Sequence, residues 1–174
     1  EKGDVLTHSY YSVLFKMSMC GNLEWADLKN IYHHSIELDN DGNFLLPSIQ
    51  YNNNNLMNIM TDEFTRDYND DSITIIDTNG NLIFQKSVTE LLIENNYLDF
   101  NFSKDPIHLN DIQPVLKDGP YWNKGDLFLS LRNLSMIILY RPFENKILKI
   151  IKGPFTKQHD VDIISEKEIT IFNN

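Results

Sequence analysis

Three of the five histidines in this sequence occur in a similar local setting, and an arginine accompanies them. His34, His108 and His159 each stand at the start of a short strand-like stretch. Arg132 ends the stretch GDLFLSLR, which is expected to pair with the strand that His108 opens. A single histidine at a strand end is usually a hydrogen-bonded structural residue, but the recurrence favours function. Together these side chains predict a local cationic site for an anionic substrate.

The neighbours of these histidines have two possible interpretations. Asn110 lies two residues after His108, and Asp160 directly follows His159. These polar side chains would either orient the imidazoles or serve as ordinary turn residues. His33 precedes His34, and the two-residue period of a strand turns it toward the other face. We therefore interpret His33 as structural.

A metal site is the weaker alternative. Three histidines can hold zinc, but H-x-x-x-H and H-E-x-x-H are absent, and Arg132 would oppose a cation. The stretch DNDGN resembles a calcium loop, but Gly42 comes too early and no glutamate follows at position twelve, so it predicts a hairpin turn. The sequence has no glycine-rich phosphate loop, G-x-S-x-G or C-x-x-C, and we expect no cofactor.

Composition excludes several classes of protein. The chain has 174 residues and a net charge of −10, which argues against a nucleic-acid-binding protein because such proteins need a basic face. It has no apolar run of the length that a membrane-spanning helix needs. Cys20 is the sole cysteine, so no intrachain disulfide can form. The sequence begins at Glu1 and shows no signal peptide.

The remaining pattern is one of paired strands. Turn residues separate strand-like stretches, most clearly at Gly42 and at Asn79-Gly80, and six consecutive hairpins are expected. One helix is predicted after Ser87, which has Glu90 three residues later in a capping-box pattern. The Asn- and Asp-rich stretch at 51–71 predicts a long insertion loop.

Two kinds of hairpin alternate along the chain, which predicts four-stranded units of the type found in β-propellers. The expected fold is all-β, with about three blade-equivalents of four antiparallel strands and one short helix insertion. Three blades do not easily close a ring, so we expect a partial propeller domain over 1–174. Its expected parts are a first hairpin at about 10–29, a blade at about 31–87, a helix at about 88–96, a blade at about 107–151 and the start of another at about 158–174.

Four stretches together resemble the bacterial PAPS-independent arylsulfotransferase family. They are YHHSIELDNDGNFLLP, DPIHLNDIQPV, GDLFLSLRNLSMIILY and QHDVDIISEKEITIFNN. The resemblance runs from the first hairpin to the last residue. It implies part of a six-bladed β-propeller and a sulfuryl transfer from an aryl sulfate to a phenol. The run H-x-N-D/S, followed by S-x-R and then Q-H-D, is more specific in combination than any of its pieces.

The resemblance implies a role for each catalytic candidate. His159 in QHD would be the nucleophile that forms a sulfohistidine. His108 and Arg132 would stabilise charge on the sulfuryl oxygens. His34, with His33 as the alternative register, would protonate the leaving phenolate. No metal is implied, because a sulfate monoester carries a single negative charge.

The same resemblance suggests substrate contacts and a compartment. Asn110, Tyr121 and Trp122 are the expected substrate-binding residues, the two aromatic side chains by stacking on an aryl ring or else by anchoring their loop. The expected partners are small aryl sulfates and phenols, and the expected location is periplasmic or secreted. Known active members also carry a signal peptide, an N-terminal β-sandwich domain and a disulfide, and this sequence shows none of them.

Two other functions remain open on the sequence. The first is a non-catalytic propeller that binds a ligand or a protein at its mouth, which predicts histidines scattered in space. The second is a metal-dependent lyase or hydrolase. The enzyme hypothesis predicts instead that His34, His108, Arg132 and His159 converge within one small-ligand site.

Overall fold

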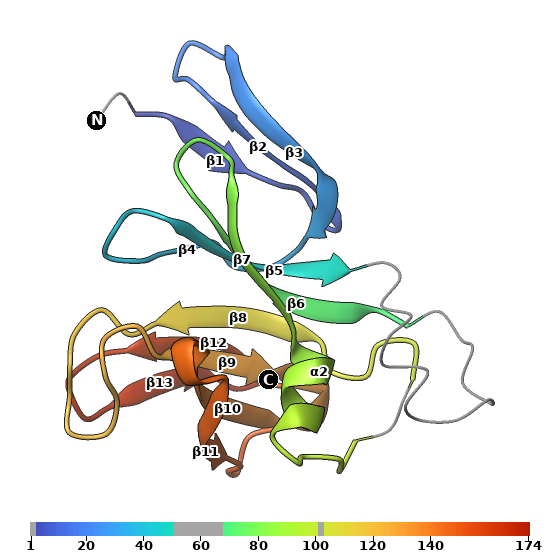
Figure 1. Cartoon of the computed structure of the whole chain (residues 1–174), viewed down its shortest axis with the longest axis vertical. Coiled ribbons are helices and arrows are strands. Elements are labelled where there is room, and N and C mark those ends of the chain that lie inside the picture. The colour runs from blue at the N-terminus through green and yellow to red at the C-terminus, as the bar shows by residue number, and fades with distance from the viewer. Residues whose placement is uncertain (1–2, 51–67, 101–102) are drawn as a thin grey trace.

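The computed structural model describes residues 3–50, 68–100 and 103–174. The described residues form antiparallel strands with one short α-helix and two 3-10 helices, which confirms the all-β prediction (Figure 1). Most of the insertion loop predicted at 51–71 lies outside the described residues. No helix in the described ranges is long and apolar enough to cross a membrane.

The first sheet contains seven strands, in the order β1-β2-β3-β5-β6-β7, with β4 also paired to β5. The strands are β1 (Val5–Thr7), β2 (Ser12–Met17), β3 (Leu23–Tyr32), β4 (Glu37–Leu38), β5 (Phe44–Gln50), β6 (Asp70–Ile76) and β7 (Leu82–Ser87). The predicted first hairpin corresponds to β2 and β3. It is continuous with the strands that follow, because the end of β3 pairs with β5.

Two smaller sheets follow along the chain. The four-stranded sheet has the order β11-β10-β9-β8, and the last sheet pairs β12 with β13. Their strands are β8 (Leu109–Pro114), β9 (Leu127–Leu131), β10 (Met136–Arg141), β11 (Lys146–Ile151), β12 (His159–Ile163) and β13 (Ile169–Phe172). The 3-10 helices η1 (Arg132–Leu134) and η2 (Pro142–Glu144) are the tight turns on either side of β10. The number of blades in a closed ring stays a prediction.

Two hairpins of the first sheet close with the same side-chain device. In the turn between β4 and β5, Asp39 Oδ1 accepts from the backbone N–H of Asn43 at 2.8 Å, and Gly42 takes a φ of +81°. Between β6 and β7, Asp77 Oδ1 accepts from the backbone N–H of Asn81 at 2.8 Å. The DNDGN stretch is therefore a hairpin turn, as predicted, because a short aspartate stands in for a backbone acceptor and glycine tolerates the left-handed conformation.

The helix α2 (Val88–Glu94) follows β7 directly. Ser87 is its N-cap, and its Oγ accepts from the backbone N–H of Glu90 at 3.0 Å, as the sequence predicted. The side chain of Glu90 accepts from Lys86 at 2.8 Å instead of returning to the cap. The buried face of α2 packs Leu91 into the core between the first two sheets.

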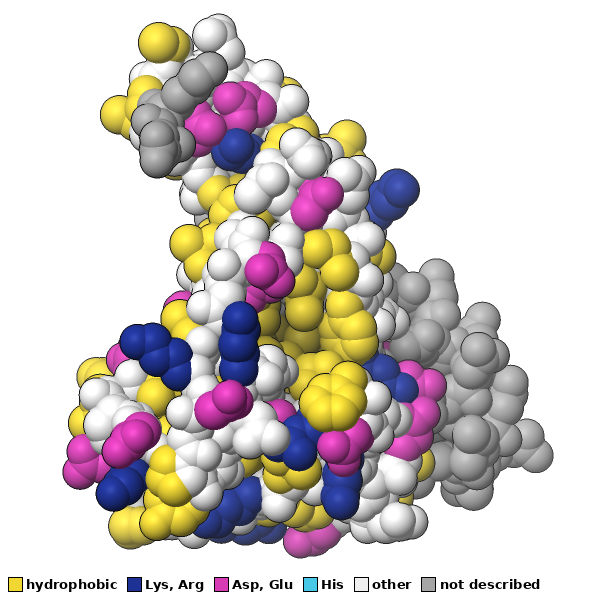
Figure 2. All heavy atoms as spheres, turned by 60° about the vertical axis from the view of Figure 1, so that its left-hand side comes forward, with side chains coloured by type: hydrophobic (Ala, Val, Ile, Leu, Met, Phe, Trp, Pro, Cys, Tyr) yellow, Lys and Arg dark blue, Asp and Glu magenta, His cyan; other side chains and the backbone are white. Residues whose placement is uncertain are grey.

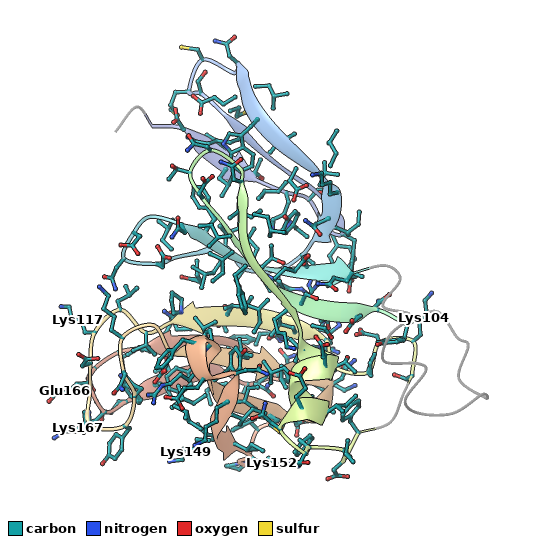
Figure 3. The ribbon with its side chains drawn as sticks, in the orientation of Figure 1. Lys104, Lys117, Lys149, Lys152, Glu166 and Lys167 are labelled. Atoms are coloured by element: carbon teal, nitrogen blue, oxygen red, sulfur yellow. The ribbon has the colours of Figure 1, made fainter. Side chains whose placement is uncertain are left out.

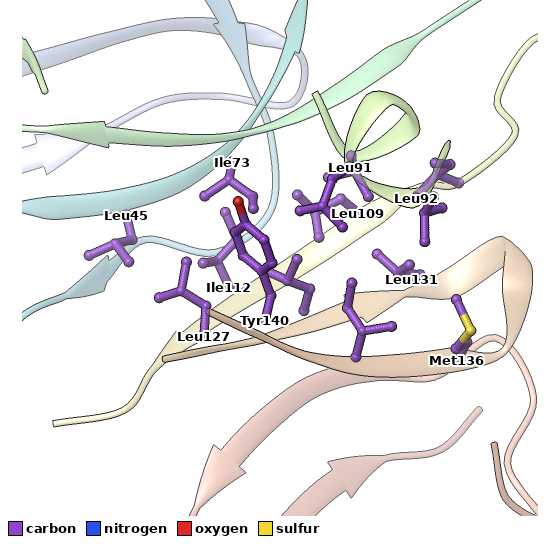
Figure 4. Packing of buried hydrophobic residues seen from close by; sticks show 14 residues of the cluster. Leu45, Ile73, Leu91, Leu92, Leu109, Ile112, Leu127, Leu131, Met136 and Tyr140 are labelled. Carbon is purple, nitrogen blue, oxygen red and sulfur yellow. The ribbon is translucent and has the colours of Figure 1, made fainter. Parts of the chain in front are cut away.

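The core consists of apolar layers between successive sheets. Alternate residues of β9 and β10 face opposite layers, as the two-residue period of a strand requires. Leu129 and Ile138 lie in the layer shared with β5, β6 and α2, whereas Phe128 and Ile137 lie in the layer shared with β12. Figure 4 shows the first of these layers. This stacking holds the starts of β4, β8 and β12 close together, because β8 contacts β4, β5 and β12.

Candidate active site

The predicted histidines converge where these sheets meet. The ring centroids of His34 and His108 are 5.0 Å apart, and those of His34 and His159 are 6.0 Å apart. His33 belongs to the same group, with its ring 5.0 Å from that of His34 and 6.5 Å from that of His108. These four imidazoles form the histidine cluster.

Strained backbone positions aim these side chains. His34 and His108 have φ values of +63° and +55°, a backbone conformation that residues other than glycine rarely adopt. In β12 the positive φ, +55°, falls on Asp160, directly after His159. The pairing of β8 shifts between Leu109 and Asp111, whereas that of β12 shifts between His159 and Val161. His108 lies one residue before the first residue of its bulge, whereas His159 is itself the first residue of its bulge. The two histidines therefore differ by one position, and the repeat is not strict.

His33 is fully buried and connects the cluster to Asp71 on β6. Its Nε2 lies 3.2 Å from Asp71 Oδ1, and its Nδ1 lies 2.7 Å from Nδ1 of His34. The other carboxylate oxygen of Asp71 accepts from the backbone N–H of Leu109 at 2.8 Å. The ring of Tyr11 stacks on His33 at 5.2 Å, with an interplanar angle of 28°. The structure therefore adds His33 to the site as a buried link between His34 and a carboxylate.

A second carboxylate holds His108 directly. Nδ1 of His108 lies 2.5 Å from Asp105 Oδ2, three residues earlier in the chain. Burial alone would raise the pKa of Asp105, but the hydrogen bond from His108 outweighs it and lowers the pKa below its usual value. The nearby charge of Arg132 acts in the same direction. An ionised Asp105 accepts from Nδ1–H and thereby fixes the orientation of the His108 ring.

Arg132 lies beside the cluster, as the hairpin argument predicted. Its backbone N–H donates to the carbonyl of His108 at 3.0 Å, and its charge lowers the pKa of both His34 and His159. Nη1 donates to Oδ1 of Asn133 at 2.9 Å. Within the described ranges its guanidinium forms no ion pair with a carboxylate. The remaining N–H groups are available to an anion.

The cluster keeps two of its imidazoles neutral. Burial, followed by the neighbouring imidazoles and the charge of Arg132, lowers the pKa of His34 to about 3. Burial and the charges of Arg132 and His108 also lower the pKa of His159, although a hydrogen bond with the Lys157 backbone opposes them. Both effects have the expected sign, since burial and like charge disfavour the protonated ring.

Asn110 lies between β8 and β12 rather than on an open surface. It is 3% exposed, and its Nδ2 donates to the backbone carbonyl of Gln158 at 2.8 Å. Gln158 is also buried, and its Nε2 donates to Ser130 Oγ at 3.1 Å. The structure thus gives Asn110 a place in the support of the segment that carries His159.

Tyr121 and Trp122 are not brought to the histidine cluster. Their loop, residues 115–126, follows the end of β8, whereas His108 precedes its start. Figure 3 shows this separation, with Lys104 and Lys117 at opposite ends of β8. Trp122 is 7% exposed and packs edge-on against Phe128, with ring centroids 5.3 Å apart. Figure 2 brings the side of this loop forward and shows no histidine.

The aromatic residue at the cluster is Tyr11, not a residue of that loop. Its φ of +50° is another left-handed position, and its ring also contacts that of Tyr10 at 4.3 Å. Burial, then the contact with Tyr10, raises the pKa of the Tyr11 hydroxyl, with smaller contributions from Asp105 and Asp71. Tyr11 therefore stays protonated and is a possible partner for an aryl ring.

Carboxylates lie further along the strands that carry the histidines. Burial and the charges of Asp111, Asp162 and Asp160 raise the pKa of Glu37 to about 7. Asp111 itself is buried, which raises its pKa to about 6, although its Oδ2 accepts from the backbone N–H of Val161 at 2.9 Å. Across the described part of the chain, no group of three or more His, Cys, Asp or Glu residues is arranged to hold a metal ion.

The fold and the site together define an all-β protein with a histidine-rich polar cluster at a junction of sheets. A profile of the arylsulfotransferase (ASST) family matches residues 6–174, so the chain belongs to that family. No match was found among curated protein sequences.

One solved structure extends the comparison of the fold. The chain is similar to a crystal structure of a protein of unknown function from Bacteroides caccae, with a TM-score of 0.59 and 13% sequence identity. The match covers 97% of this chain and 48% of that one, so the chain spans about half the length of that protein. At this identity the likeness shows the fold alone.

Sequence reasoning missed the residues that support the histidines. Asp71, Asp105 and Tyr11 were not predicted, and His33 was interpreted as structural or as the alternative register to His34. Asp105 leaves a weak signal, because it stands three residues before His108 within one turn. Asp71 leaves none, because both of its partners are distant in the sequence. Leu109 lies 38 residues after it, and His33 lies in an earlier connection between strands.

Proposed function

We propose that this protein transfers a sulfuryl group from an aryl sulfate to a phenolic acceptor through a sulfohistidine on His159. The convergence of His34, His108 and His159 beside Arg132 carries the proposal. Membership of the arylsulfotransferase family supports it.

In the first half-reaction, an unprotonated ring nitrogen of His159 attacks the sulfur of the aryl sulfate. The N–S bond forms as the S–O bond to the aryl group breaks, and the phenolate leaves with the bonding electron pair. Net charge is conserved, because the neutral imidazole becomes a zwitterionic sulfohistidine and the single negative charge passes to the phenolate. The lowered pKa of His159 keeps the nucleophile in its reactive form near neutral pH.

Arg132 and His108 would stabilise the sulfuryl oxygens during transfer. The guanidinium has no carboxylate partner among the described residues, so it can donate to two oxygens at once. Asp105 accepts from Nδ1–H of His108, so Nε2 of that ring donates to a sulfuryl oxygen when the imidazole carries both protons. Donors fixed in advance are effective because they need no reorganisation as charge develops.

In the second half-reaction, the acceptor phenol loses its proton as its oxygen attacks the sulfur and the N–S electron pair returns to His159. The family resemblance suggested that His34 acts as an acid toward the leaving phenolate. With a pKa of about 3, His34 is unprotonated at neutral pH, so it suits the role of proton acceptor from the phenol. A good leaving group such as 4-nitrophenolate departs without an acid.

The direct test is to trap the covalent intermediate. Purified full-length protein is incubated with 4-nitrophenyl sulfate without an acceptor, and its peptides are analysed by mass spectrometry. We expect an adduct of about 80 Da, the mass of SO₃, on His159, and its loss when phenol is added. His159→Ala should abolish both adduct and turnover, whereas the control His8→Ala should retain them, since His8 Nδ1 lies against the Ser9 carbonyl. Turnover that survives His159→Ala would refute the assignment.

The binding-module hypothesis makes a different geometric prediction. It expects histidines dispersed over separate regions, whereas the centroid distances of 5.0 and 6.0 Å around His34 are those of one compact site. A protein that binds aryl sulfates but forms no adduct and no product would favour the binding module over the enzyme.

A further inference from the structure

We infer that Asp71 and His33 form a relay that fixes the proton of His34 on Nδ1 and leaves Nε2 unprotonated for the acceptor phenol. Both are positioning residues, because they act through His34. The functional part of this inference rests on the proposed function, whereas the position of the proton is a property of the protein itself.

The relay begins at a carboxylate whose two oxygens have separate partners. Asp71 Oδ2 accepts from the backbone N–H of Leu109 at 2.8 Å, so the carboxylate is tied to the start of β8. Oδ1 lies 3.2 Å from Nε2 of His33. This is a charge contact without the alignment of a hydrogen bond, and Nε2 has no hydrogen-bond partner among the described residues. A carboxylate oxygen at this distance disfavours a lone pair on Nε2, so His33 places its proton there.

The two imidazoles are joined by one hydrogen bond, which needs a single proton. Nδ1 of His33 and Nδ1 of His34 are 2.7 Å apart, which requires one donor and one acceptor. Because a neutral His33 carries its proton on Nε2, its Nδ1 is the acceptor and Nδ1–H of His34 is the donor. Nε2 of His34 then holds a lone pair, and no residue of the described ranges forms a hydrogen bond with it.

The relay requires a neutral His33, since a protonated ring would donate from both nitrogens and move the proton of His34 to its other nitrogen. The 3.2 Å separation from Asp71 is longer than the roughly 2.7–2.9 Å of a charge-assisted N–H···O bond, which favours the neutral ring. Stacking on Tyr11 keeps the ring in this orientation.

The decisive variant is Asp71→Asn, which should invert the relay without removing it. The N–H of Leu109 needs an acceptor, so the amide oxygen takes the place of Oδ2 and the NH₂ group faces Nε2 of His33. His33 must then accept at Nε2 and donate from Nδ1, which moves the proton of His34 to Nε2. The expected observation is a change of His34 tautomer, measured by NMR of the ¹⁵N-histidine-labelled full chain.

The activity measured with a phenol acceptor supplies the second readout. Loss of a proton acceptor typically costs about 10²–10⁴-fold, so we expect a fall of at least about 10²-fold for Asp71→Asn in turnover with phenol. Formation of the sulfohistidine from 4-nitrophenyl sulfate should change far less, because that step needs no proton acceptor. Asp105→Asn is the matched control, because it alters the carboxylate of His108 and should leave the His34 tautomer unchanged.

Substitutions of His33 test the relay independently of Asp71. His33→Leu keeps the buried volume but supplies neither contact, and it should free the His34 tautomer and slow turnover with phenol. His33→Gln can donate to Asp71 and accept from His34, so it should recover part of the rate and the Nδ1–H tautomer.

The outcomes test the relay and the proposed function separately. A His34 protonated on Nε2 in the unaltered protein, or a tautomer that ignores both Asp71→Asn and His33→Leu, would overturn the relay. A tautomer that changes as expected in a protein without sulfuryl transfer would uphold the relay and refute the proposed function.

Discussion

The two ends of strand β8 differ in chemistry, burial and backbone conformation. The start, at His108, is polar, with imidazoles and carboxylates buried together and positive φ at His34 and His108. At the far end Trp122 packs on Phe128, and the buried carboxylate of Asp126 is satisfied by both Nε and Nη2 of Arg141. Clustered imidazoles and strained backbone reduce stability and persist where function requires them. On the proposed function, the first end serves chemistry and the second serves folding.

Arg132 gives the largest expected effect on the histidine side of this comparison. Arg132→Gln should lower kcat/KM by about 10²–10³-fold, the usual loss when one fixed donor to a developing anion is removed. Because the charge of Arg132 lowers the pKa of His34 and His159, its loss should also raise both values and move the acid limb of the pH–rate profile upward. Steady-state kinetics across pH measures both effects.

The controls for Arg132 distinguish the effect of its positive charge from the effect of its planar arrangement of hydrogen-bond donors. Arg132→Lys should recover only part of the rate, since lysine keeps the charge but not the planar arrangement of donors. Lys117→Gln removes an exposed charge at the other end of β8 and should leave the kinetics unchanged (Figure 3). Equal losses in all three variants would mean that net charge, and not the site, sets the rate.

If the comparison holds, substitution of Trp122 should reduce stability and leave catalysis largely unchanged, the opposite of the result expected for Arg132. Trp122→Ala should lower the free energy of unfolding by about 3–5 kcal/mol, as expected when a buried aromatic side chain is deleted from a core. The kcat of the protein that remains folded should stay within about twofold of the unaltered value. Chemical denaturation and activity per folded molecule measure the two quantities. A selective loss of kcat without loss of stability would restore Trp122 as a substrate contact.

The sequence predicted the hairpins well because their determinants are local. Gly42 and Gly80 mark turns that need a left-handed residue, and Ser87 caps the helix that follows β7. These signals lie within a few residues of the elements that they specify. The continuity of β3 with β5 was not predicted, because it depends on pairing between distant segments.

The candidate site was predictable only in part, for the same reason. His34, His108 and His159 were found by their recurrence before strands, and Arg132 by hairpin geometry. Asp71 and His33 depend on contacts across sheets, which leave no periodic pattern in the sequence. Tyr121 and Trp122 were selected as aromatic residues close to His108 in the chain, but the full length of β8 separates them from it.

Tyr121 provides the smallest expected effect and the sharpest test of that separation. Its side chain is 63% exposed, so Tyr121→Ala should change the free energy of unfolding by no more than about 0.5 kcal/mol. Because the loop lies at the far end of β8, KM for the aryl sulfate should also stay unchanged. Tyr11→Leu is the matched variant at the cluster, where loss of the ring that stacks on His33 should raise KM or lower kcat. A raised KM for Tyr121→Ala alone would mean that the substrate reaches both ends of β8, and that the division between chemistry and folding is wrong.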